Sequence, residues 1–167
     1  DNQVVKAGDL LATIEDSDFI VAVNAAKAQV EGAKITVDGL EARLVQQETA
    51  IRQAQAALDA DNASLRLART NRARYSNLAA DGSGTLQALQ QAEAQLSIQL
   101  AAQQKNQAGL QAAREQVGIL EADLQKARAA HSQALSGQAS AELKLSHTRI
   151  RAPVSGTLGQ KSVAVGS

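Results

Sequence analysis

The sequence predicts a mainly α protein in which a long antiparallel two-helix coiled-coil hairpin is inserted into a small split β domain. Two long segments, together residues 18–146, carry apolar residues at a seven-residue spacing. A short polar interruption, residues 79–85, separates them near the middle of the chain and marks the predicted tip of the hairpin. Segments typical of strands and turns, residues 1–17 and 147–167, lie outside both and are predicted to form the two halves of the β domain.

The composition favours helices that pair along a narrow seam over a compact globular core. The 167 residues include one Phe, one Tyr and no Trp, Met or Cys, so the large side chains that fill a globular interior are mostly missing. The 17 basic and 17 acidic residues are interspersed, which indicates neither nucleic acid nor an anionic membrane surface as a partner. No stretch approaches the roughly 20 apolar residues of a membrane span.

The N-terminal segment is predicted to form a turn and a short strand. Gly8 and Asp9 separate two apolar runs, as in a tight turn, and residues 10–14 alternate as a strand does. Residues 15–18 supply N-cap candidates and negative charge, both of which stabilise a helix N-terminus. The first helix is therefore predicted to start near Ser17 or Asp18.

A strict heptad repeat predicts a coiled-coil seam in the first helix. Its spacing of 3.5 residues per turn implies a left-handed supercoil against a partner helix. The a positions are Val23, Val30, Val37, Leu44, Ile51, Leu58 and Leu65. The d positions are Ala26, Ala33, Leu40, Gln47, Ala54, Asp61 and Ala68.

The second helix continues the repeat with a more polar seam. Gln99, Gln103 and Asn106 place three amides in or beside it, where we expect wet packing or a contact with another chain. Each helix has about 60 residues and spans on the order of 90 Å, and the short connection requires the two to run antiparallel and to pair. The a positions are Leu89, Leu96, Gln103, Leu110, Val117, Leu124, His131, Gln138 and Leu145, and the d positions are Ala92, Gln99, Asn106, Ala113, Leu120, Ala127, Ala134 and Ala141.

The C-terminal segment is predicted to return to the N-terminal one. Pro153 cannot continue a helix, and residues 153–156 have the composition of a turn between two extended pieces. Folding the hairpin about Asp81 and Gly82 brings residues 6–9 opposite residues 155–157, so the two β segments must meet in space.

These end segments resemble a known domain. Residues 1–11 (DNQVVKAGDLL) and 148–157 (TRIRAPVSGT) resemble the two half-motifs of a biotinyl-lipoyl-like domain. A lipoyl-like domain split by a long helical hairpin is the signature of periplasmic adaptor proteins, also called membrane fusion proteins, of the HlyD/EmrA/AcrA type. The very long hairpin favours the EmrA-like branch. In this resemblance the turn residues Gly8, Asp9, Pro153 and Gly156 shape the lipoyl-like unit.

The resemblance also implies a docking site at the tip. In this family the tip meets a TolC-like outer-membrane channel through an Arg, a Leu four residues on and a Ser seven residues further. The matching positions here are Arg74, Leu78 and Thr85, where Thr keeps the hydroxyl and adds a methyl group. Arg can donate several hydrogen bonds, Leu can fill a groove, and the hydroxyl can both cap the second helix and bond across an interface.

The function implied by the resemblance is that of a periplasmic adaptor subunit in a tripartite multidrug efflux or secretion system. Such a subunit bridges an inner-membrane transporter, of the major facilitator or ABC class, to the outer-membrane channel, and forms homo-oligomers. We expect it in the periplasm, anchored to the inner membrane by parts outside this chain, together with further lipoyl strands and β-barrel segments. We expect no enzymatic activity, since no nucleophile, base and oxyanion set can be assembled. We expect no cofactor, because the chain enters the helix after Ile14 instead of presenting a carrier lysine.

Several other interpretations are open from the sequence. His131 and His147 suggest a metal site, but they lack clustered ligands and fit a polar seam position and a helix end. Asp61 is either a proton-sensing carboxylate or a solvated or Arg-paired one. Four arginines between residues 66 and 74 suggest nucleic-acid binding but lack interleaved aromatic residues. The alternative for the whole chain is a cytoplasmic coiled-coil scaffold without a transport role.

Overall fold

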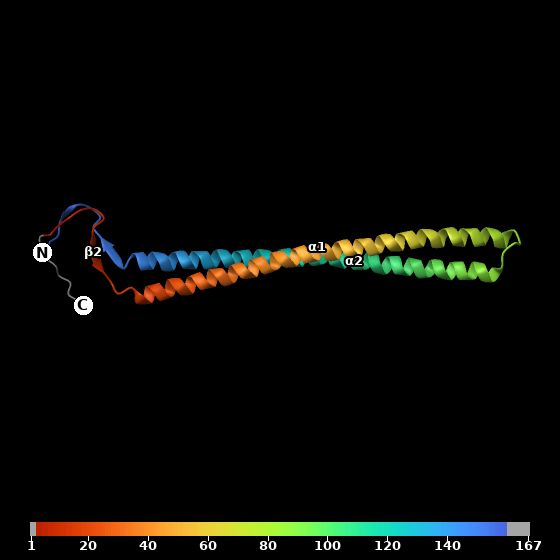
Figure 1. The fold of residues 1–167 in the computed structure, drawn as a ribbon, viewed down its shortest axis with the longest axis horizontal. Helices are drawn as coiled ribbons and strands as arrows, with labels where there is room; N and C mark the ends of the chain where they lie inside the picture. The colour runs from red at the N-terminus through yellow and green to blue at the C-terminus, as the bar shows by residue number, and fades with distance from the viewer. Residues whose placement is uncertain (1–2, 160–167) are drawn as a thin grey trace. The chain divides into compact units, whose positions relative to one another are not determined.

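The structure, a computed structural model, describes residues 3–159 and has the predicted fold class: two long helices in a hairpin, with short antiparallel strands at the ends of the chain (Figure 1). Its elements are β1 (Val4–Val5), β2 (Leu10–Thr13), α1 (Ser17–Ala80), α2 (Leu86–Ser146), β3 (Arg149–Arg151) and β4 (Gly156–Thr157). The parts of the predicted β segments at residues 1–2 and 160–167 lie outside the described residues.

The chain divides into two compact units, which are described separately. The base unit comprises residues 1–37 and 127–167 and holds all four strands. The tip unit comprises residues 38–126 and holds the turn between the helices. This division follows the contacts within the chain. The sequence predicts other boundaries, at residues 17 and 147, which separate the lipoyl-like segments from the hairpin, and these stay a prediction.

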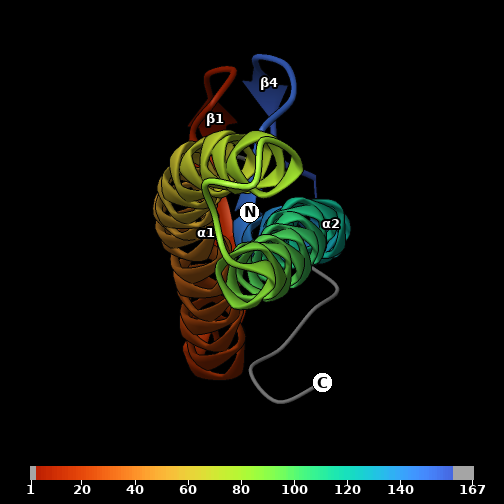
Figure 2. The ribbon, with the colours of Figure 1, turned by 90° about the vertical axis from the view of Figure 1, so that its right-hand side faces the viewer.

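In the base unit, the two ends of the chain pair strand by strand. β1 pairs antiparallel with β4, with Val5 opposite Gly156, and β2 pairs antiparallel with β3, with Thr13 opposite Arg149. The register of the second pair shifts between Leu10 and Ala12, as a β-bulge does. Figure 2 shows β1 and β4 side by side. The expectation that the N- and C-terminal segments meet is therefore confirmed for the described residues.

Thr148 connects the helix ends to the strands of the base unit. It is 2% exposed, and its hydroxyl donates a 2.7 Å hydrogen bond to the carbonyl of Leu145 at the end of α2. Its own carbonyl accepts a 2.8 Å hydrogen bond from the N–H of Ile14, just before α1. A buried hydroxyl with a satisfied hydrogen bond costs little, whereas an unsatisfied one is expensive. The chain therefore enters α1 and leaves α2 through one hydrogen-bonded junction.

In the tip unit, α1 and α2 run side by side and the turn joins them at one end (Figure 1). Every predicted seam position of this unit is buried or partly buried, and Leu65 is 2% exposed. Large apolar residues away from the seam, such as Leu67 and Ile98, stay more than half exposed. The heptad pattern thus identified the face along which the helices pack. In the base unit the predicted seam positions of both helices are likewise buried or partly buried.

Several polar side chains in the seam have partners within the chain. Gln103 Nε2 donates to Asn62 Oδ1 at 2.6 Å, and Asn106 Nδ2 donates to Asp61 Oδ2 at 2.5 Å. Gln47 Nε2 donates to the carbonyl of Ala113 at 2.7 Å. These bonds join α1 to α2 in antiparallel order. The Asp61 carboxylate is thus bonded to an amide of α2, whereas the sequence left open a proton-sensing, solvated or Arg-paired carboxylate. Gln103 and Asn106 have bonding partners in α1 of this chain.

Candidate functional site

The connection between the helices is shorter than the predicted interruption. Ala79 and Ala80 belong to the last turn of α1, so the turn consists of residues 81–85. Alanine has the highest helix propensity, which explains why the helix includes both residues before the first turn-forming residues, Asp81 and Gly82. Figure 2 looks onto this turn, where the last turn of α1 and the first turn of α2 face the viewer.

α1 ends in a Schellman motif. Gly82 has a φ of +72°, the left-handed conformation that glycine adopts without steric cost. The N–H of Ser83 donates to the carbonyl of Leu78 at 2.9 Å, and the N–H of Gly82 donates to the carbonyl of Ala79 at 3.3 Å. These two bonds satisfy carbonyls that would otherwise lack partners at a helix C-terminus. The motif fixes the direction in which the chain leaves α1.

α2 begins with Thr85 as its N-cap. The Thr85 hydroxyl oxygen accepts a 3.2 Å hydrogen bond from the N–H of Ala88, and the Thr85 carbonyl accepts a 3.3 Å bond from the N–H of Leu89. Thr is among the preferred N-cap residues because its oxygen satisfies one of the free N–H groups of the first turn. As the hydroxyl accepts in this bond, its own hydrogen stays available to donate to another molecule.

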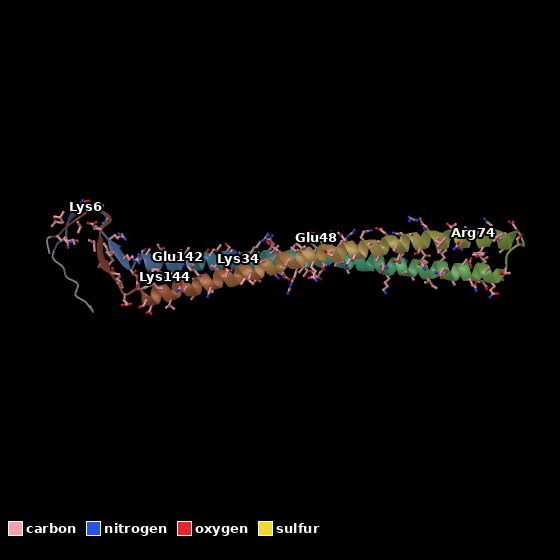
Figure 3. All side chains as sticks on the ribbon, viewed as in Figure 1. Lys6, Lys34, Glu48, Arg74, Glu142 and Lys144 are labelled. Atoms are coloured by element: carbon pink, nitrogen blue, oxygen red, sulfur yellow. The ribbon has the colours of Figure 1, made fainter. Side chains whose placement is uncertain are left out.

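The structure places the three predicted tip residues near the turn. Leu78 and Thr85 lie at its two ends, and Arg74 lies one helical turn before Leu78. Leu78 is 37% exposed, and its carbonyl accepts bonds from the turn that leads directly to the exposed Thr85. Arg74 is also exposed and lies four residues before Leu78, on the same side of α1. Figure 3 labels Arg74 in the last part of α1, near the turn. The three residues thus combine a guanidinium, an apolar side chain and a hydroxyl at one end of the tip unit.

A shallow hollow of about 290 Å³ lies between the helices close to this turn. Tyr75, 37% exposed, forms part of its wall, and Ala68 and Ala92 are buried beneath it. The sequence analysis did not single out Tyr75. Two signals pointed to it: Tyr75 lies seven residues after Ala68, at a d position of the heptad, and it is the only tyrosine in the sequence. The hollow is lined by Ala68, Asn71, Tyr75, Ala88, Gln91, Ala92 and Gln95.

The arginines near the turn differ in their surroundings. Arg72 forms an ion pair of 3.4 Å with Glu93 of α2, and both side chains are about half exposed. Exposed ion pairs of this kind contribute about 0–1 kcal/mol, so this one is a minor stabilising contact. Arg69 and Arg74 are exposed on the outside of the helix. The Glu93 carboxylate therefore offsets part of the positive charge of this group.

The predicted turn residues of the base unit shape its strands. Gly8 has a φ of +93°, and its N–H donates to the carbonyl of Ala152 at 2.8 Å. Asp9 Oδ2 accepts a 2.8 Å bond from the N–H of Lys6, which closes the turn before β2. Pro153 lies in the bend between β3 and β4, and Gly156 pairs with Val5. These residues lie in a different unit from the tip residues.

The arrangement near the hairpin turn is chemically suited to recognition. It offers hydrogen-bond donors beside an exposed apolar side chain on a rigid turn. Among residues 3–159, no group of three His, Cys, Asp or Glu side chains gathers as metal ligands do. His131 lies partly buried in the seam and His147 lies exposed after the end of α2.

A mainly helical hairpin that splits a small β unit, with a donor-bearing turn, is an arrangement suited to binding another protein. The chain belongs to the membrane fusion protein family: the family model described as "RND MFP, barrel-sandwich hybrid domain" matches residues 1–167. The resemblance to periplasmic adaptor proteins is therefore confirmed at the level of the family. Members of this family bridge other proteins and are not enzymes, which agrees with the expectation for this chain.

Two solved structures are similar to the chain. The structure of the periplasmic adaptor protein EmrA has 13% sequence identity and a TM-score of 0.46, with 99% of this chain and 62% of that chain covered. The crystal structure of MacA from Actinobacillus actinomycetemcomitans has 25% identity and a TM-score of 0.31, with 98% and 38% covered. The chain thus spans less than two thirds of either protein. No curated protein matches the chain.

Neither helix is long and apolar enough to cross a membrane within the part of the chain that the structure describes.

Proposed function

We propose that this chain is part of a periplasmic adaptor subunit of a tripartite multidrug efflux or secretion system. The adaptor bridges an inner-membrane transporter to a TolC-like outer-membrane channel, and the hairpin turn docks on the channel. The observation that carries the proposal is the exposed set Arg74, Leu78 and Thr85 at a turn held by a Schellman motif and an N-cap, in a chain of the membrane fusion protein family.

Docking at the turn uses the chemistry of each of these side chains. The Arg74 guanidinium donates to carbonyl or carboxylate oxygens at the channel mouth. The exposed Leu78 side chain fills an apolar groove, and the burial of its apolar surface stabilises the contact. The Thr85 hydroxyl caps α2 and donates its hydrogen across the interface.

The paired strands support the proposal that residues 1–17 and 147–167 form the two halves of a lipoyl-like domain. Both pairs join the N-terminal segment to the C-terminal one, as a split domain requires. Gly8, Asp9, Pro153 and Gly156 shape its turns, and the unit packs against copies of itself in a homo-oligomeric ring. The full-length protein is anchored to the inner membrane and lies in the periplasm.

Three classes of inner-membrane transporter fit the proposal. The EmrA-like branch predicts a major facilitator transporter, and the ABC class is the alternative from the sequence. The family model adds the RND class to these two. Membership of this family favours an adaptor over a cytoplasmic scaffold in every case.

The test is the double substitution Arg74→Asp with Leu78→Asp in the full-length adaptor. We expect it to abolish drug resistance or export and to remove the crosslink between a cysteine at the exposed position 83 and a co-expressed TolC-like channel. Two carboxylates replace the guanidinium donor and the apolar side chain, so docking loses two of its three interactions. Helicity by circular dichroism is expected to stay unchanged, because neither residue lies in a buried part of the seam.

The matched control is Arg66→Asp with Leu67→Asp, which makes the same two changes at exposed positions of α1 away from the turn. It should leave export and crosslinking as in the wild type. Normal transport by the Arg74 and Leu78 double variant would show that the turn is not the docking site.

A further inference from the structure

We infer that Gly84 is a positioning residue of the proposed docking site, because the lack of a side chain there lets the turn close onto Leu78. The inference rests on the proposed function of the turn. It assigns to Gly84 a role different from that of Gly82: Gly82 permits the reversal of the chain, whereas Gly84 sets how Leu78 and Thr85 lie relative to each other.

The geometry around Gly84 leaves no room for a Cβ atom. A Cβ built there would lie 2.9 Å from Leu78 Cβ, 3.1 Å from the Leu78 carbonyl carbon and 3.1 Å from the Ala79 nitrogen. Two of these three atoms are backbone, and the third is the Cβ that every residue except glycine carries. None of them can move away by a side-chain rotation, so the turn itself would have to open.

Other glycines of the chain lack this constraint. A Cβ added at Gly82 meets nothing within 4 Å, and its requirement is only the positive φ. A Cβ added at Gly109 or Gly118, in the middle of α2, also meets open space. Among the ten glycines whose surroundings the structure describes, Gly84 is the one that contacts its neighbours this closely.

The close approach at Gly84 is part of the hydrogen bonding of the turn. The Leu78 carbonyl accepts two bonds, from the N–H of Ser83 at 2.9 Å and from the N–H of Gly84 at 2.8 Å. The residue after Gly84 is Thr85, which caps α2. If the turn opens at Gly84, the second bond to Leu78 is lost and the Thr85 hydroxyl shifts relative to the Leu78 side chain. The seam below, from Ala68 and Ala92 onward, does not involve these atoms.

This mechanism predicts a dependence on the presence of a Cβ and not on side-chain size. Gly84→Ala and Gly84→Ser place the same Cβ against the same atoms, so the two variants should behave alike. Gly118→Ala is the matched control, since it makes the same chemical change in open space.

The experiment uses the full-length adaptor carrying each substitution and measures two quantities. Hydrogen exchange with mass spectrometry reports the protection of peptides that cover residues 78–88. Co-purification of a co-expressed TolC-like channel reports docking. We expect Gly84→Ala and Gly84→Ser to raise amide exchange in the turn and to lower channel capture by about tenfold, as the loss of one well-placed contact implies. Exchange in the peptides of the seam and helicity should match the wild type, as should both readouts for Gly118→Ala.

Each result bears on the inference separately from the proposed function. Unchanged exchange at residues 78–88 in Gly84→Ala would overturn the inference, because the turn would have accepted a Cβ without opening. Raised exchange with normal channel capture would also overturn it, provided that Arg74→Asp with Leu78→Asp still abolishes capture, and the proposed function would then stand. If the double variant too captures the channel normally, the proposed function fails, and with it the site that Gly84 would position.

Discussion

Thr85 performs two tasks with one hydroxyl group. Its oxygen accepts the N–H of Ala88 and caps α2, while its hydrogen stays available for an acceptor on another molecule. An N-cap also holds the side chain in one rotamer, so the donor is presented in a fixed direction. A site whose donor is already oriented loses less entropy on binding than one on a mobile loop.

Substitutions at Thr85 separate these two tasks. Thr85→Val removes both and should lower the stability of the hairpin by about 1 kcal/mol as well as weaken docking. Thr85→Asp retains a good N-cap but has no hydrogen to donate and adds a charge, so stability should be kept and docking lost. Thr85→Ser should retain both. Thermal unfolding followed by circular dichroism and channel co-purification measure the two effects, and normal docking by Thr85→Asp would contradict the donor role.

At the scale of the helices, stability depends on a narrow line of small and medium-sized side chains. Leu65, Ala68, Ala92, Leu110 and Leu124 are buried, while apolar residues off the seam are exposed. Since alanine buries little area, the leucines and valines of the seam supply most of the hydrophobic stabilisation. The bonds of Asp61 and Asn62 to the amides of α2 add a polar layer, which disfavours other registers of the hairpin.

Two neighbouring leucines test this account of the seam. Leu65→Ala removes a side chain that is 2% exposed and should destabilise the hairpin by about 2 kcal/mol or more. Leu67→Ala makes the same change at a residue that is 63% exposed and should alter stability by less than about 0.5 kcal/mol. Denaturant unfolding of both variants gives the comparison. Equal losses would mean that the outer face, too, is covered in the folded protein.

At the scale of the whole chain, the two ends are joined by contacts between residues more than a hundred positions apart. The N–H of Ala7 donates to Ser155 Oγ at 2.9 Å, and Arg151 Nη1 donates to the carbonyl of Gly8 at 2.8 Å. Each strand is short, and a pair of short strands is barely stable alone. The stability of the base unit therefore depends on both ends of the chain. A substitution at one end should also destabilise the strands of the other end.

Gly8 offers a test of that coupling. Its φ of +93° is strained for any residue with a Cβ, although the space around it is open, so Gly8→Ala should cost about 1–2 kcal/mol. Hydrogen exchange should then rise in β3 as well as in β2, because the N–H of Ala152 bonds to the carbonyl of Asp9. Gly156→Ala, also in open space but without a positive φ, should leave both strands protected. Faster exchange in β2 alone would show that the two ends are not coupled.

Local patterns in the sequence were enough to predict the fold class, the helix pairing and the face along which the helices pack. Heptad spacing and turn residues are local signals, and they agree with each other along the whole chain. The family resemblance also came from two short end segments and was confirmed.

The choice of partners for the polar groups, and the place where a side chain cannot fit, depend on the folded structure. The bond of Asp61 to Asn106 depends on the register between two distant segments, which no local pattern contains. The closeness of Gly84 to Leu78 depends on how tightly the turn closes, and in the sequence Gly84 looks like any other turn glycine. Periodicity is encoded residue by residue, whereas contacts across a turn or a seam arise only when the chain has folded back on itself.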